Sequence, residues 1–170
     1  MKFFIVSIAA LFSMTAAYAG TTCPDGTSDR DIPNVLIAEV NASRMMFVLS
    51  KSGSYWIIPY FDSENPNDPE AVTGGTIISA CTGELGERAM EMPKGIHYLS
   101  QEKAVAIALA SLNLPADTPI QEAVRNFAPA LGNYSRFFPL WKITVNAQTI
   151  VYVTNTGKVE DPKKQRRLGG

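Results

Sequence analysis

Two stretches of this sequence repeat one order of strand and turn signals, and that order constrains the fold more than any other feature. Each copy has a strand that carries a tryptophan, a second strand rich in β-branched residues, and a Thr-Gly turn. The copies comprise residues 55–59 with 76–87 and residues 140–143 with 149–160. We therefore expect Trp56 and Trp141 to anchor two related halves of one domain, at about 31–90 and 99–160. A chance similarity between two β-hairpins is the alternative.

Two helices are predicted between the tryptophans. The first spans residues 101–114, because Ser100 can cap it and apolar residues recur at helical spacing until a proline ends it. The second spans residues 119–127, where Thr118 and Gln121 match a capping box and a proline takes the first helical position. Its buried face would comprise Ile120, Ala123, Val124 and Phe127.

Together these signals predict an α+β domain, in which an antiparallel β-sheet carries packed helices. The apolar content of 46% and the net charge of −1 exclude a disordered chain, and 170 residues are enough for a core. The domain should cover residues 20–160, followed by a flexible basic tail at 161–170, and residues 34–44 fit either a short helix or a strand. The strands are expected at residues 47–49, 55–61, 76–81, 138–145 and 149–154.

The first 19 residues have the three parts of a secretory signal peptide. Lys2 provides the positive charge, residues 3–12 form an apolar stretch too short to span a membrane, and Ala-Tyr-Ala at 17–19 is a small-x-small cleavage site. We expect cleavage after Ala19 and a soluble mature protein, without a transmembrane segment, in the periplasm or outside the cell. Lipid attachment at Cys23 is the weaker alternative, because a threonine precedes it where a small residue such as Gly or Ala is needed.

The expected mature chain contains two cysteines, Cys23 and Cys81. An even number of cysteines in an oxidising compartment favours a disulfide bond. Closing this loop would stabilise the fold by about 4 kcal/mol on the chain-entropy model. The alternative is a redox or metal-binding thiol pair, but the chain lacks CxxC spacing and histidines near the cysteines.

The second half of the chain carries the motifs of a known family in the segments LSQEKAVAIALASL (99–112) and FPLWKITVNAQTIVYVTNTGKVE (138–160). Ser100 and Glu102 match the start of the family's helix, Trp141 its W-x-[VI] strand, and Gly157 its Thr-Gly turn. On these motifs, residues 99–160 resemble the PepSY family, a propeptide-like domain of protease propeptides and exported bacterial proteins.

The resemblance implies a fold of PepSY-like α-β halves and a role as a peptidase inhibitor. The predicted helix at 119–127 is an addition to the family pattern. The matching residues, together with the first tryptophan, are fold anchors: Trp56, Trp141, Tyr152 and Gly157. The family offers no catalytic residues to transfer.

Catalytic motifs are missing from the sequence. His97 is the only histidine, and neither a nucleophile elbow, an HExxH helix, a P-loop nor a GxGxxG motif occurs, so we predict a protein that is not an enzyme. Met90 and Met92 together with His97 form the soft-ligand set that Cu(I) prefers, which makes them a candidate metal site. The alternative is that the methionines pack between a strand and a helix. No other cofactor is predicted.

Aromatic residues before the last hairpin are a candidate partner surface. Tyr134, Phe137 and Phe138 cluster in one loop, where they either grip a partner or anchor the core. From Lys158 onward there are five basic and two acidic residues, a net charge of +3, which suits an anionic surface or simply a solubilising tail. The overall charge of −1 gives no electrostatic case for nucleic acid.

The leading prediction is therefore an exported, non-enzymatic binding protein that contacts a protein partner, as a PepSY-like peptidase inhibitor or modulator. The alternative is a periplasmic protein that binds a small ligand or copper.

Overall fold

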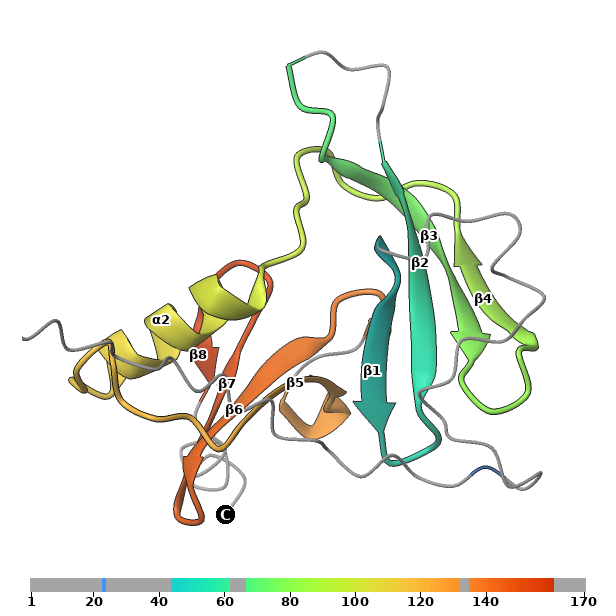
Figure 1. Ribbon diagram of the computed structural model, residues 1–170. Helices are drawn as coiled ribbons and strands as arrows, with labels where there is room; N and C mark the ends of the chain where they lie inside the picture. Colours follow the sequence, from blue (N-terminus) through green and yellow to red (C-terminus); the bar gives the residue numbers. More distant parts are fainter. Residues whose placement is uncertain (1–22, 24–43, 62–66, 132–134, 161–170) are drawn as a thin grey trace, which may run out of the picture.

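Eight β-strands form one continuous sheet in the order β4-β3-β2-β1-β5-β6-β7-β8 (Figure 1). The computed structural model describes residue 23 and residues 44–61, 67–131 and 135–160. The strands are β1 (Met46–Ser50), β2 (Tyr55–Phe61), β3 (Val72–Ser79), β4 (Leu85–Ala89), β5 (Glu122–Phe127), β6 (Leu140–Asn146), β7 (Thr149–Val153) and β8 (Val159–Glu160). The helices in this part of the chain are α2 (Gln101–Ser111) and a short 3-10 helix, η2 (Pro129–Leu131).

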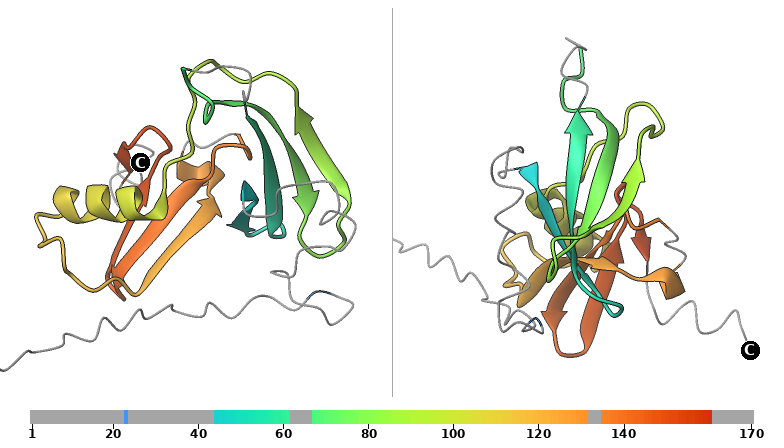
Figure 2. Two further views of the ribbon diagram at one scale, coloured as in Figure 1. Left: turned by 45° about the horizontal axis from the view of Figure 1, so that its top comes forward. Right: turned by 90° about the vertical axis from the view of Figure 1, so that its right-hand side faces the viewer.

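The sheet consists of two antiparallel meanders that meet at a parallel pair of strands. Strands β1 to β4 pair in chain order, as do β5 to β8. The meanders join where β1 runs parallel to β5, with Leu49 opposite Asn126 and Ser50 opposite Phe127. Figure 2 shows the two meanders as separate wings that diverge from this junction. The sheet is therefore mixed rather than antiparallel throughout.

Helix α2 confirms the first predicted helix. The Ser100 side chain accepts a hydrogen bond from the Lys103 backbone N–H at 3.3 Å, as expected of an N-cap. The helix ends at Ser111, three residues early, and Asn113 takes a left-handed conformation with φ of 54°. Asparagine tolerates that conformation, and the proline that follows Leu114 disfavours further helix.

The second predicted helix is wrong, because residues 122–127 form strand β5 instead. The Gln121 backbone N–H, which a capping box would direct toward Thr118, donates to the Thr144 carbonyl at 2.9 Å. Strand β5 then pairs with β6 on one side and β1 on the other. Two neighbouring strands satisfy the backbone of this short segment better than a helix of two turns, which is marginal by itself even with a capping box.

This difference overturns the predicted fold class. The described residues are mostly β-sheet with one α-helix, rather than an α+β domain of several packed helices and PepSY-like α-β halves. The expected strands are confirmed as β1, β2, β3, β6 and β7 with shifted ends. Almost all of the ambiguous segment 34–44 lies outside the described residues, as do the predicted signal peptide and basic tail.

The hydrophobic core has separate clusters on the two faces of the sheet. On one face, α2 covers Trp141, Ile143 and Val153. The register places Trp56, with Ile58 and Ile78, on the opposite face. Trp56 lies opposite Phe47, which shares a face of β1 with Leu49, and Leu49 lies opposite Asn126, the neighbour of Arg125 on β5. Since Arg125 lies opposite Trp141, Asn126 and Trp56 are on the face away from Trp141. Both tryptophans occupy the second strand of a meander, and the internal duplication stays a prediction.

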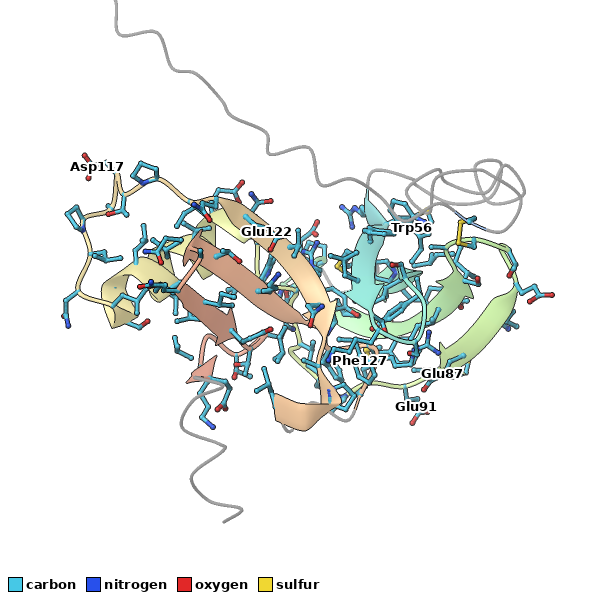
Figure 3. All side chains as sticks on the ribbon, turned by 90° about the horizontal axis from the view of Figure 1, so that it is seen from below. Trp56, Glu87, Glu91, Asp117, Glu122 and Phe127 are labelled. Atoms are coloured by element: carbon cyan, nitrogen blue, oxygen red, sulfur yellow. A yellow bond between two sulfur atoms is a disulfide. The ribbon has the colours of Figure 1, made fainter. Side chains whose placement is uncertain are left out.

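The predicted disulfide is confirmed. Cys23 and Cys81 are bonded, with their Cα atoms 5.3 Å apart, and the bond ties Cys23 to the turn after β3 beside the β1–β4 wing (Figure 3). Such a bond belongs to a protein of an oxidising, exported location. Within the described residues, every helix is too short or too polar to cross a membrane.

Candidate functional site

The three residues of the predicted copper site have different surroundings. Met90 is 70% exposed just after β4, whereas Met92 packs against the core cluster around Tyr55. The His97 imidazole Nε2 lies 3.0 Å from the Asp68 carboxylate, so it already has a partner. Among the described residues, groups of three or more His, Cys, Asp and Glu that could hold a metal do not occur. Copper binding stays a prediction without a preformed ligand set to favour it.

The aromatic loop is more buried than a partner surface requires. Phe137 is 4% exposed and belongs to the core cluster of the β1–β4 wing. Phe138 is partly buried and packs against the same cluster, and Tyr134 lies outside the described residues. Phe137 therefore anchors the core, which was the alternative to a partner surface. Phe138 also lines a cavity.

The predicted fold anchors occupy the second wing as well as the first. The Trp141 Nε1–H donates to the Leu99 carbonyl at 2.8 Å, which fastens the segment that leads into α2. Gly157 has φ of +80°, and a Cβ atom there would lie 3.3 Å from Ile107 of the helix, so glycine is required at this turn. Tyr152 is half-buried on β7, opposite Lys142 and Glu160.

Strand β4 is one edge of the sheet, with the two-residue β8 at the other, and it is the most exposed strand described. Among the described residues it pairs only with β3, and residues 85–88 are all exposed. Two large apolar side chains flank it, Leu85 at 60% and Met90 at 70% exposure, and they are the exposed large hydrophobic residues of the described chain. Sequence patterns missed this strand, because Leu-Gly-Glu-Arg-Ala lacks the β-branched residues of the other strands.

The chemistry of this edge suits an extended polypeptide. A strand with one neighbour leaves alternate N–H and C=O groups unpaired along its outer side. Strand β4 has neither proline nor lysine; its ladder with β3 has one register irregularity, beside Ile77 and Ile78. Glu87 and Arg88 leave the sheet on opposite faces, since they are consecutive in that ladder, so one face of the edge carries a negative charge and the other a positive one. We name β4 together with Leu85 and Met90 the edge site.

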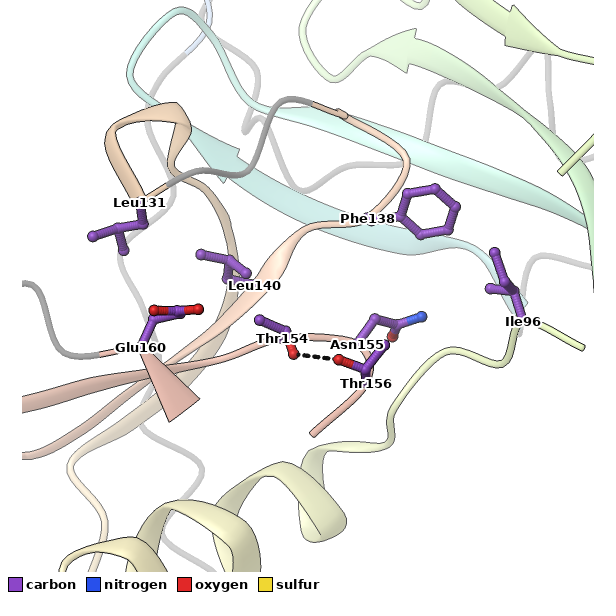
Figure 4. A pocket seen from close by; sticks show the side chains of 8 residues that line it. All are labelled: Ile96, Leu131, Phe138, Leu140, Thr154, Asn155, Thr156 and Glu160. Carbon is purple, nitrogen blue, oxygen red and sulfur yellow. Dashed lines mark hydrogen bonds between the residues drawn. The ribbon is translucent and has the colours of Figure 1, made fainter. Parts of the chain in front are cut away.

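Two cavities lie beside the connector between the wings, residues 90–100. The first, of about 320 Å³, is lined by the apolar side chains of Ile96, Leu131, Phe138 and Leu140 and by four polar residues, three of them in the turn after β7. Figure 4 shows the polar turn at its opposite wall, where the Thr154 and Thr156 hydroxyls are hydrogen-bonded at 2.9 Å.

The second cavity, of about 290 Å³, is polar, and we name it the connector pocket. It lies where the start of β1, the end of β2, the connector and β5 meet, and its lining includes Arg44, Glu70, Tyr98 and Arg125. Burial lowers the pKa of Arg125 to about 10. The neighbouring Tyr98 has the opposite, smaller effect on that pKa and raises it. Burial raises the pKa of Tyr98 above its usual range, and Arg125 opposes that shift. At neutral pH the pocket therefore holds a charged arginine and a neutral tyrosine.

The connector pocket could not be predicted, because the pattern of residues 119–127 indicates a helix and Arg125 lies on strand β5. In a strand over 122–127, Arg125 shares one face with Ala123 and Phe127, because alternate residues point to the same side.

In comparisons with known proteins, no family model matches this sequence, and no curated protein or solved structure is similar enough to indicate a family. The assignment of function therefore depends on the geometry of these sites and on the motifs of residues 99–160.

Proposed function

We propose that this protein is an exported, non-enzymatic binding protein that acts through direct contact with a partner protein, with a peptidase as the expected partner. The signal peptide of residues 1–19 directs it to the periplasm or the medium, and cleavage follows Ala19. The mature chain would then begin at Gly20, which the mass of the exported protein tests directly.

The observation that carries the proposal is the edge site. Its exposed backbone can accept one further strand, and Leu85 and Met90 offer apolar contacts at the two ends of that strand. The occupant is an extended segment of the partner, whose main chain would pair with β4. Main-chain pairing supplies affinity, and the flanking apolar residues supply selectivity.

The resemblance of residues 99–160 to the PepSY family supports the choice of a peptidase as partner. Peptidase modulation is the role associated with that family, and it requires contact rather than catalysis. The motif residues Trp141 and Gly157 support the scaffold, which leaves the edge site free for the contact.

Site-specific photo-crosslinking tests the proposal in the exporting cell. A crosslinking residue replaces Leu85 or Met90 in turn, and the exposed helix residue Ala110 serves as the matched control. We expect one protein to crosslink at both edge positions and not at the helix position. The partner, once purified, should bind the mature protein in a defined stoichiometry and change its peptidase activity on binding.

Introducing charges at the apolar contacts gives an independent measurement. The double variant Leu85→Lys with Met90→Lys should weaken binding of the purified partner at least about tenfold, because it places charges where apolar contacts form. The double variant Ala106→Lys with Ala110→Lys changes the net charge equally on the exposed side of α2 and should leave binding unchanged. Equal affinity of both double variants would refute the edge site.

A further inference from the structure

The connector pocket contains a positive charge without a negative partner. Arg125 is mostly buried, and its guanidinium lies over the Trp141 ring at 4.3 Å from the centroid. Its Nη2–H donates to the Leu99 carbonyl at 3.4 Å. Among the described residues, no carboxylate lies within ion-pair distance of this guanidinium. Arginine has five N–H donors, so most of them are left for another group.

The other charged groups around this pocket already have partners. Arg44 pairs with the Glu70 carboxylate at 2.9 Å, and it lies over the Phe61 ring at 4.5 Å from the centroid. His97 pairs with Asp68 at 3.0 Å. Among the described residues, Arg125 is therefore the charged side chain of the lining that lacks an ion-pair partner.

A buried charge without a partner is costly, and such charges are normally paired. The stack on Trp141 and one long hydrogen bond hold the guanidinium in place without neutralising it. An anion that entered the pocket would pair with a donor fork that is already oriented, so little side-chain entropy would be lost on binding.

We propose that the connector pocket binds a carboxylate attached to an apolar group, with Arg125 as the residue that pairs with the carboxylate. One negative charge balances the Arg125 guanidinium, whereas the Glu70 carboxylate would repel the second charge of a dianion such as a phosphate. Apolar lining from Met46, Pro59 and Phe61 provides a place for a side chain next to the carboxylate. A cavity of about 290 Å³ has room for one amino-acid-sized group.

This carboxylate can come from a small organic acid or from the C-terminus of a polypeptide. Both present the same planar, singly charged group, which matches the arginine fork. The inference goes beyond the proposed partner contact and does not depend on it, because β4 contributes no residue to the pocket.

Calorimetric titration of the full mature protein tests the inference with N-acetylphenylalanine as the probe. N-acetylphenylalanine amide, which has the same shape without the charge, is the matched ligand control. A short peptide that ends in phenylalanine distinguishes the sources: tighter binding of the peptide assigns a C-terminus, and equal or weaker binding assigns a small acid. We expect saturable binding of at least one acid, at least about tenfold tighter than its amide.

Two arginine variants locate the binding site. Arg125→Gln should weaken acid binding by at least about tenfold. Arg136→Gln is the matched control, because Arg136 also stacks on an aromatic ring, that of Tyr55 at 4.4 Å, but does not line the pocket. It should bind the acid as the wild type does.

Three results would overturn the inference: no saturation by either acid at about 10 mM, equal binding of acid and amide, or an equal loss in both arginine variants. If Arg125→Gln does not fold, the comparison of acid with amide on the wild-type protein still decides, since it needs no variant.

Discussion

Replacing each tryptophan by phenylalanine should have very different costs, although the two side chains are similarly buried. Trp141 is 6% exposed and Trp56 9%, and both lie on the second strand of a meander. The Trp141 Nε1–H donates to the Leu99 carbonyl at 2.8 Å, and Arg125 lies over its ring. The Trp56 Nε1 atom is buried without a hydrogen-bond partner among the described residues.

The expected magnitudes follow from these contacts. Loss of part of the indole ring costs each variant about 1–2 kcal/mol in packing. Trp141→Phe also loses a hydrogen bond worth about 1 kcal/mol and weakens a cation–π contact by about 0.5 kcal/mol. Trp56→Phe removes an unsatisfied buried N–H group, which returns about 1 kcal/mol. Trp141→Phe should therefore be less stable than Trp56→Phe by about 2–3 kcal/mol.

Urea unfolding of the two variants measures this difference. Each variant keeps one tryptophan, so fluorescence follows unfolding in both, and circular dichroism checks that both probes report one transition. Equal unfolding free energies, or a larger loss in Trp56→Phe, would show that the hydrogen-bonding difference between the two indoles does not decide their stability.

Three further changes have expected outcomes. Replacing Cys23 and Cys81 by serine opens a loop of 58 positions and should lower the unfolding free energy by about 4 kcal/mol in urea titrations; a loss of under about 1 kcal/mol would contradict the chain-entropy account. Gly74→Ala places a Cβ atom 2.6 Å from a backbone carbonyl and should cost about 1–3 kcal/mol in thermal unfolding, whereas Gly86→Ala meets no atom closer than 3.5 Å and should cost less than about 0.5 kcal/mol. Burial raises the pKa of Tyr98, so its stabilising contribution is complete below about pH 10 and is lost as pH rises through the folded-state pKa. Burial raises the pKa of Tyr55 as well, so the late step in the tyrosinate absorbance of the wild type should become smaller in Tyr98→Phe by the contribution of one tyrosine, and an unchanged late step would contradict the burial of Tyr98.

Elements with strong local signals could be predicted from the sequence. The β1–β2 hairpin has apolar strands on either side of a polar turn, and Gly53 adopts φ of +116° in that turn. Helix α2 has its Ser100 cap, and the two cysteines form the expected bond. Each of these features depends on residues close together in the sequence or, for the disulfide, on the number of cysteines.

Features that depend on distant strands could not be predicted in this way. Residues 122–127 contain helix formers such as Glu122 and Ala123 as well as strand formers such as Val124 and Phe127, and only the pairing of β5 with β1 and β6 decides between a helix and a strand. The connector pocket was missed for the same reason, because its residues come from five separate segments. The edge site consists of a strand whose composition resembles a loop.

The parallel junction between the wings sets the order in which the chain can be completed. Leu49 on β1 and Asn126 on β5 are separated by 77 positions, so β1 lacks its partner strand on that side until residues 122–127 have emerged. Until β5 arrives, β1 and β4 both offer unpaired backbone to neighbouring chains, which is the condition for aggregation. A holding chaperone that shields β1 during export would therefore increase the yield of folded protein more than one that acts after residue 127 has crossed.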